Sequence, residues 1–407
     1  MAVDFNDVAT LAARIGPRPA GSPPEQRAAG YVTERLQRLG IPAAALPVVI
    51  PRGFSLVYVA LFVMAALSVA LARFSVVLGL ILCLVALVLL AAEGTAHPAV
   101  SRLLARRPSQ NVVGLIPTLT EDGEQIADPT RRVILTAHLD SGRAGLLWRP
   151  ALVRRFRALT LAMLGSVVLI ALLQVVQLAT RSRGVWWISL APFLLLLVGI
   201  ALLVEREARG GAVAGANDDA SGVAAILGVA ATLQRDRPVH VETWTLFTSG
   251  EESGMAGLRQ FLGDNQFDPD RTFFVNVDSV GSGGVRYTRS EGLIVPLRSS
   301  PVLTRMANEI ARNHPEWAVR PQAHQLLPTD QYVALSHGYQ AIGVFAVDAT
   351  GHVPHWHQPT DTVEHIDVRT VTTAADFVLA LVRRLDSEAG EAMARVPLPE
   401  TAADLNT

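Results

Sequence analysis

Two reactive residue types are scarce or absent in this chain of 407 residues. The one cysteine, Cys83, lies within an apolar run, which excludes an intrachain disulfide and a thiolate metal cluster. All 35 basic residues are arginine, so the chain has no lysine for Schiff-base catalysis. Charged residues make up only 17% of the chain, and the formal net charge of −1 does not suggest nucleic acid as a partner.

Apolar residues make up 50% of the chain and are concentrated in two blocks, residues 54–92 and 158–204. Each block is about twice the ~20 residues that a helix needs to cross a bilayer. Arg73 interrupts the first block and residues 181–184 interrupt the second. We therefore expect two transmembrane hairpins, and so an integral membrane protein with four spans. The alternative is a set of core helices in a soluble protein, which two adjacent full-length pairs disfavour.

A hairpin returns the chain to the side of the bilayer that it left. Residues 1–53, 93–157 and 205–386 should therefore lie on one face and fold together as one catalytic domain. We expect residues 387–407, which are rich in Ala, Pro and Glu, to be disordered. Arginines crowd the domain-side flanks of both blocks, so the positive-inside rule favours a cytoplasmic domain. Because the short hairpin tips also carry arginines, an extracytoplasmic location of the catalytic domain is not excluded.

The remaining segments alternate between strand and helix patterns. This alternation predicts an α/β fold with a mostly parallel central sheet flanked by helices. Sites in such folds form at the carboxyl ends of the strands. The β-rich runs are 112–116, 133–137, 241–247, 273–277 and 341–347, and the helical patterns are 25–39, 221–234, 302–312 and 371–385.

Six histidine or acidic residues lie at the ends of these strands or in the loops that follow. Histidine and carboxylate ligands without sulfur suit Zn²⁺, and they also suit Mn²⁺ and Co²⁺. One shared carboxylate would give each of two metals three protein ligands and leave a position for water. The set that predicts a two-metal hydrolytic site is His138, Asp218, Glu251, Glu252, Asp278 and His357.

Two of the motifs have ordinary structural alternatives as well. Asp218 and Asp219 precede the helix expected at 221–234, where both can cap the helix, or one can cap it while the other bridges two metals. His138 closes a strand, and Asp140 can accept the proton of its second ring nitrogen and so orient the imidazole. Alone, the Asp218–Asp219 motif is better explained as a helix cap, and the His138–Asp140 motif as an ordinary strand end and turn.

The other motifs are similarly ambiguous one at a time. Glu251 and Glu252 are adjacent, so one can bind metal while the other deprotonates the metal's water, or both can begin a helix. Asp278 ends an apolar strand and needs either a metal or a hydrogen-bond network. Near His357, we expect His352 and His355 not to be primary ligands.

Together the motifs resemble the M28 family of zinc metallopeptidases. The segments Ile15–Ser22 and Asn111–Gly114 are also similar to that family. The resemblance implies a zinc-peptidase-like (phosphorylase/hydrolase-like) fold, two Zn²⁺ ions, a peptide substrate and aminopeptidase activity through a metal-bridging hydroxide. The implied roles are His138 and Asp278 on one zinc ion, Glu252 and His357 on the other, Asp218 as the bridge, Glu251 as general base and Asp140 as the orienter of His138.

Several functions stay open on the sequence alone. A carboxypeptidase or a single-metal glutaminyl cyclase has a related fold, and so does a non-catalytic receptor or assembly protein. The two hairpins depart from the soluble family pattern. Only 13 residues separate Val204 from Asp218, which at ~3.6 Å per residue limits the site to about 50 Å from the bilayer. We therefore expect the lipid bilayer and membrane-associated peptides as partners.

Overall fold

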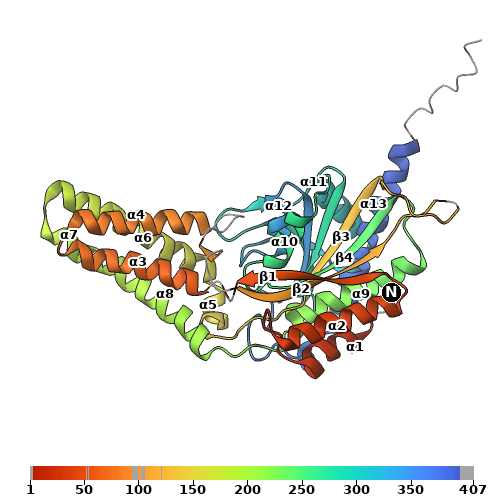
Figure 1. Ribbon diagram of the computed structural model, residues 1–407, viewed down its shortest axis with the longest axis horizontal. Helices are drawn as coiled ribbons and strands as arrows, with labels where there is room; N and C mark the ends of the chain where they lie inside the picture. The colour runs from red at the N-terminus through yellow and green to blue at the C-terminus, as the bar shows by residue number, and fades with distance from the viewer. Residues whose placement is uncertain are drawn as a thin grey trace, which may run out of the picture.

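The structure, a computed structural model, describes residues 3–51, 53, 55–93, 100–101, 106–120 and 122–394. An α/β domain and a bundle of long helices lie end to end along its longest axis (Figure 1). Chain segments before, between and after the two apolar blocks contribute strands to the same sheet.

The sheet has nine strands in the order β1-β2-β4-β3-β5-β9-β6-β7, with β8 paired to β6. It is mixed, and this corrects the expectation of a mostly parallel sheet. Parallel pairing holds for the central strands β4, β3, β5 and β9 and for β6 with β8, whereas β1, β2, β6 and β7 pair antiparallel along the path. The bounds are β1 Ala43–Pro51, β2 Arg106–Ile116, β3 Arg131–His138, β4 Val241–Thr248, β5 Thr272–Val277, β6 Gly284–Glu291, β7 Leu297–Arg298, β8 Arg320–His324 and β9 Gln340–Val347.

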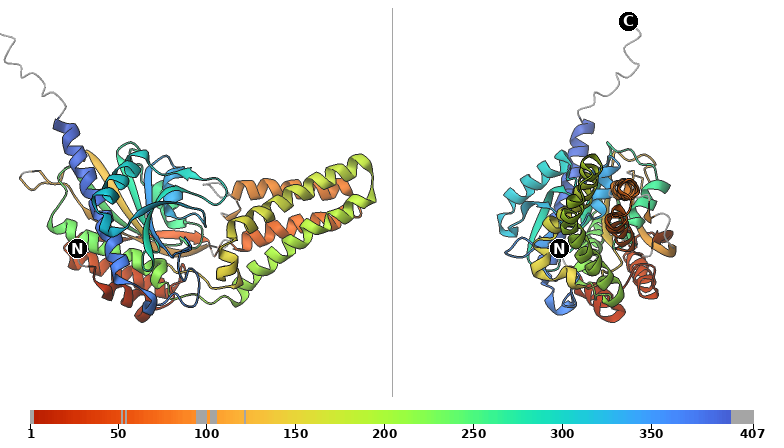
Figure 2. Two further views of the ribbon diagram at one scale, coloured as in Figure 1. Left: turned by 180° about the vertical axis from the view of Figure 1, so that it is seen from behind. Right: turned by 90° about the vertical axis from the view of Figure 1, so that its left-hand side faces the viewer.

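Helices cover both faces of this sheet (Figures 1 and 2). Successive residues of β3 show the two faces, because Val133 and Leu135 belong to one buried cluster and Ile134 to another. The first face carries α1 (Phe5–Ala9), α2 (Pro23–Arg38), α9 (Ser221–Arg235), α11 (Pro301–Asn313) and α13 (Val368–Ala394). The second carries α10 (Ala256–Asp264) and α12 (Asp330–Ser336).

Helix α13 corrects the expectation for the tail. It runs to Ala394, so residues 387–394 are helical rather than disordered. Its buried residues include Leu385 and Ala389, which join the core beneath the sheet and explain why the helix continues. Residues 395–407 lie outside the described residues.

The bundle contains α3 (Ser55–Ala72), α4 (Val76–Glu93), α6 (Phe156–Thr180), α7 (Arg183–Ile188) and α8 (Leu190–Arg209). Helix α3 packs against α4 and α8, and α6 also packs against both. All project from the same end of the α/β domain, with both hairpin turns at the far end (Figure 1). Four helical stretches, Ser55–Ala72, Val76–Glu93, Phe156–Thr180 and Arg183–Arg209, are long and apolar enough to cross a membrane.

Apolar side chains face outward from this bundle, while polar ones face inward. Leu67, Val88 and Leu172 are 54%, 66% and 57% exposed. Inside, the Gln174 side-chain amide donates to the carbonyl and hydroxyl oxygens of Ser68 at 3.1 and 3.2 Å. This distribution is the reverse of that in a water-soluble helical bundle and suits an apolar surrounding.

Candidate metal centre

The central strands bring the predicted site residues to one edge of the sheet. His138 is the last residue of β3, Asp278 follows β5, and Glu251 and Glu252 follow β4. These strands are parallel, so their carboxyl ends meet at the same edge. Asp218 lies in the short helical turn Ala216–Ala220 before α9, and His357 lies in the loop after β9.

Asp218 lies between the two histidines. Its Oδ1 is 2.9 Å from His138 Nε2, and its Oδ2 is 3.2 Å from His357 Nε2. His357 Nε2 is also 2.8 Å from Glu252 Oε1. One buried carboxylate therefore presents an oxygen to each of two imidazoles, which is the geometry that a bridging ligand needs.

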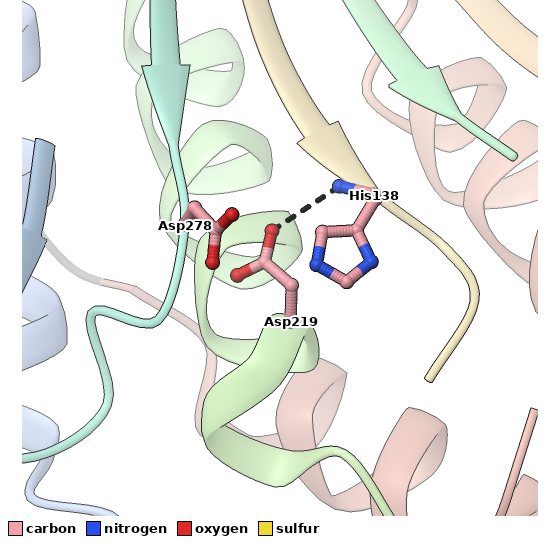
Figure 3. Close-up of side chains that lie close together, drawn as sticks. All are labelled: His138, Asp219 and Asp278. Atoms are coloured by element: carbon pink, nitrogen blue, oxygen red, sulfur yellow. Dashed lines mark hydrogen bonds between the residues drawn. The ribbon is translucent and has the colours of Figure 1, made fainter. Parts of the chain in front are cut away.

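Two groups of donor atoms are close enough to hold metal ions: His138, Asp219 and Asp278, and Asp218, Glu252 and His357. Figure 3 shows the first group, with the Asp219 carboxylate between His138 and Asp278. Among the described residues, these groups include neither Glu251 nor His355.

Asp219 has a structural task of its own. Its Oδ1 accepts from the backbone N–H groups of Gly222 and Ser279, and its Oδ2 accepts from that of His138 (Figure 3). It thus caps α9 and ties that helix to the ends of β3 and β5. The Asp218 carboxylate, by contrast, accepts no backbone N–H of the described residues and faces only the two imidazoles, so Asp218 is the freer carboxylate of the two.

Asp140 differs in detail from the expectation. The Nδ1 atom of His138 lies 2.9 Å from the backbone carbonyl oxygen of Asp140 and 3.7 Å from its carboxylate. The carboxylate instead accepts the backbone N–H groups of Glu251 and Glu252, at 3.2 and 3.1 Å. The main chain of Asp140 therefore orients the imidazole, and its side chain fixes the glutamate loop.

Two supporting residues were not predicted from the sequence. Asp361 accepts the backbone N–H groups of Asn217 and Asp218. Arg18 is 1% exposed and donates to the carbonyl oxygens of Leu139 and of four other residues, Leu11, Gly16, Ala214 and Gly215. Arg18 lies within the segment that resembles the zinc peptidases, but nothing in its local pattern shows that it joins the His138 and Asp218 loops.

Burial and close charges shift the acid–base equilibria of the metal-free site. Burial raises the pKa of Glu251 well above its usual range, with the Glu252 and Asp278 carboxylates adding to the effect. Burial would also raise the pKa of Asp218, but hydrogen bonds to both imidazoles lower it. For His357, burial lowers the pKa, but Glu252 and Asp218 more than offset this and raise it to about 9.

The donor atoms fit zinc. Asp218 Oδ2 and Glu252 Oε1 are buried, and the described residues offer them only the Nε2 atom of His357, at 3.2 and 2.8 Å; buried carboxylate oxygens with so few partners are costly. The surrounding set is imidazole and carboxylate, which zinc prefers when thiolates are absent. Zinc coordination would satisfy these carboxylate oxygens together with the imidazole beside them.

Glu291 and Asp330 are further buried acids next to the site. Glu291 Oε1 accepts the Thr329 N–H, and Oε2 has no partner. Burial raises the pKa of Glu291 to about 8, and that of Asp330 to about 6. Asp330 Oδ2 accepts the Thr248 hydroxyl at 2.5 Å, so this residue supports the end of β4.

An aromatic cluster joins the site to the helix bundle. The ring of Trp148 meets His357 edge-on at 4.6 Å between centroids, and it lies 4.9 Å from Trp356 and 5.4 Å from Phe156. Phe156 is the first residue of α6. The site is therefore only two side chains from a candidate membrane span, far closer than the upper limit set by chain length.

A cavity of about 460 Å³ opens onto the same residues. Its walls include Asp218, Glu251, Asp278 and His357, and they continue to apolar side chains of α3, α6 and α8. The volume is within the usual range for a small-molecule site.

A mixed sheet flanked by helices, with imidazoles and carboxylates gathered at its carboxyl edge, is the fold of a zinc peptidase. Residues 201–382 match the model of Peptidase family M28. The match contains Asp218, Glu251, Glu252, Asp278 and His357, whereas His138 lies before it.

Solved structures share this fold at low sequence identity. A Zn-dependent exopeptidase from Parabacteroides distasonis is 15% identical, with 94% of this chain and 98% of that chain covered and a TM-score of 0.52. A zinc aminopeptidase from Bacillus subtilis is 14% identical, with 94% of each chain covered and a TM-score of 0.55. A glutaminyl cyclase from Porphyromonas gingivalis is 13% identical, with 94% and 99% covered and a TM-score of 0.55. Among curated proteins, no sequence matches this chain.

Proposed function

We propose that the protein is a membrane-embedded peptidase with two zinc ions, which removes the amino-terminal residue from peptides. The observation that carries the proposal is the position of Asp218, with one oxygen toward His138 and the other toward His357. A site for one metal needs only one of these histidines.

The proposed ligands divide between two ions. His138 and Asp278 would hold one zinc ion and Glu252 and His357 the other, with Asp218 as the shared ligand. The bound ions would polarise the peptide carbonyl and acidify the attacking water. His138 presents Nε2 to the ion because the carbonyl oxygen of Asp140 holds its Nδ1 proton.

Glu251 is the proposed general base. Its backbone is held by Asp140, and its pKa is raised by burial. A carboxylate with a raised pKa accepts a proton from water more readily and can return it to the leaving amine. Glu251 lines the cavity next to Asp218 and Asp278 but belongs to neither metal group, which leaves it available for proton transfer.

The four apolar helical stretches are the proposed membrane spans. Because they all leave one end of the α/β domain, the site would lie at the bilayer surface. Arginines flank the domain side of the spans, and we assign the domain to the cytoplasm by the positive-inside rule. A reporter enzyme fused to the carboxyl terminus tests this assignment, since an active periplasmic-type reporter would contradict it.

The reaction is tested with a peptide that has a free amino terminus and the same peptide with the amino terminus acetylated. We expect the zinc-loaded full chain to release the first residue of the free peptide only. Glu251→Gln should lower kcat by roughly 10²–10⁴-fold, the usual contribution of a general base, while still binding zinc. The matched control is Glu124→Gln on an exposed loop. Equal cleavage of both peptides would refute the aminopeptidase assignment.

Because solved glutaminyl cyclases share this fold, one further experiment distinguishes a peptidase from a cyclase. A peptide beginning with glutamine is followed by mass spectrometry. Release of free glutamine supports the peptidase, whereas loss of ammonia with the chain intact supports a cyclase.

A further inference from the structure

The cavity at the metal centre does not end in the α/β domain. It continues between the membrane helices, where its walls include Phe62 of α3, Met163 of α6, and Gly199 and Leu203 of α8. We call this part the inter-helix cavity. Peptide hydrolysis at the metal centre does not require an apolar cavity between helices. The inter-helix cavity is therefore a candidate binding site for an apolar part of the substrate.

We propose that the inter-helix cavity holds a long unbranched alkyl or acyl chain, so that the substrates are lipid-modified peptides or amino-acid amides. This inference rests on the proposed peptidase function and names its substrate class. The polar end of such a molecule would reach the metal centre while its chain lies between α3, α6 and α8.

The chemistry of the walls favours an alkyl chain over a stretch of polypeptide. Buried peptide N–H and C=O groups need hydrogen-bond partners, at a cost of roughly 1–3 kcal/mol each when they are missing. Phe62, Met163 and Leu203 offer none, and among the cavity-lining residues of α3, α6 and α8 only Tyr58 and Thr160 carry a polar side-chain group. Glu93, at the rim, already accepts the N–H groups of Val100 and Ser101. An alkyl chain needs no partner and gains free energy from leaving water.

The continuity of the walls gives the second argument. The aromatic cluster of Trp148, Phe156 and Trp356 lies where the site meets the bundle. These rings pack against one another from His357 to the first turn of α6, and all three line the cavity. An amphiphile taken from the bilayer could therefore keep its chain on apolar surface while its amide reaches the zinc ligands.

The probes are two series of leucine-like amides, used with the zinc-loaded full chain in nanodiscs. One series is leucine n-alkylamides from methyl to decyl, with the chain on the leaving amine. The other is 2-amino-alkanoic acid methylamides, with the chain on the amino-terminal residue. Each methylene moved from water into the cavity should raise kcat/KM about fourfold until the cavity is full. We expect this rise in at least one series.

Variants of cavity residues test whether a chain-length effect comes from binding in the cavity or only from partitioning of the amides into lipid. A Cβ at Gly199 would meet Met163 Sδ at 2.2 Å, so Gly199→Leu should push Met163 into the cavity and collapse the decyl-to-methyl ratio of kcat/KM. The matched control is Gly165→Leu on α6, where a Cβ meets nothing within 4 Å; its ratio should equal that of the wild type. Leu202→Ala widens the cavity and should move the optimum to longer chains.

The outcomes are distinct. Hydrolysis of the methylamides with no chain-length response in either series overturns the inference and leaves the peptidase standing. Equal collapse in the Gly199 and Gly165 variants also overturns it. No hydrolysis of any amide by the zinc-loaded wild type refutes the proposed function, and the inference falls with it.

Discussion

Replacing Trp148 tests whether the aromatic cluster between the helix bundle and the metal centre supports that centre. Trp148 is fully buried and touches His357, Trp356 and Phe156 with ring centroids 4.6, 4.9 and 5.4 Å away. Truncating such a residue to alanine costs about 3–5 kcal/mol. Its indole N–H has no hydrogen-bond partner, which offsets part of that value, so we expect a net loss of about 3 kcal/mol.

The effect on zinc is the sharper readout. Trp148 holds the ring of a proposed ligand, and loss of a group that orients a ligand usually lowers metal affinity by about 10–100-fold. We expect Trp148→Ala to weaken zinc binding by this factor, measured by competition with a chromophoric chelator in nanodiscs. Trp148→Phe keeps a ring against His357 and should recover most of the affinity.

The matched control is Trp187→Ala. Trp187 lies in α7 at the far end of the bundle and is 67% exposed, so its loss should leave zinc affinity unchanged. Wild-type zinc affinity in the Trp148→Ala protein would refute the idea that the aromatic cluster orients His357.

Two further substitutions act on the ligands and on a buried acid. A Cβ at Gly142 would lie 2.4 Å from Glu252 Oε1 and 2.8 Å from His357 Nε2, so Gly142→Ala should weaken zinc binding at least about tenfold. The matched control is Gly30→Ala in α2, where a Cβ meets nothing within 4 Å and zinc affinity should not change. Equal zinc affinities of the two variants would contradict this prediction. Burial raises the pKa of Glu291 to about 8 in the folded protein, above its unfolded value of ~4.3. As pH rises between these two values, ionisation of Glu291 should therefore lower the free energy of unfolding of the metal-free protein by up to about 5 kcal/mol. Glu291→Gln should abolish that loss, and thermal melts of both proteins that stay parallel from pH 5 to pH 9 would count against it.

The sequence predicted the central strands because each is a buried run followed by a polar motif. Residues 133–137, 241–247 and 273–277 correspond to β3, β4 and β5, with ends one or two residues away. The edge strand β1 was missed for a physical reason. Strand β1 contains Pro47 and Pro51, which argue against a strand, but an edge strand tolerates proline because one side of it needs no donors.

For the site as well, the sequence reveals the residues in local motifs but not the tertiary contacts that hold them. The six proposed functional residues stand in short motifs, and the structure gathers them at one edge. The groups that hold them in place are far away in sequence: Arg18 reaches the Asp218 loop, and Trp148 reaches His357. Asp140 lies beside His138 as expected, but its main-chain oxygen is nearer to Nδ1 than its carboxylate is, at 2.9 against 3.7 Å, and a sequence does not reveal which atom of a turn residue points toward a ring.

Counting zinc ions tests the central claim most directly. The metal-free full chain in nanodiscs is titrated with zinc, and bound metal is measured after removal of the excess. We predict two ions per chain in the wild type and one in His138→Ala, in which Glu252 and His357 remain. A single ion in the wild type, unchanged by His138→Ala, would contradict the two-zinc centre.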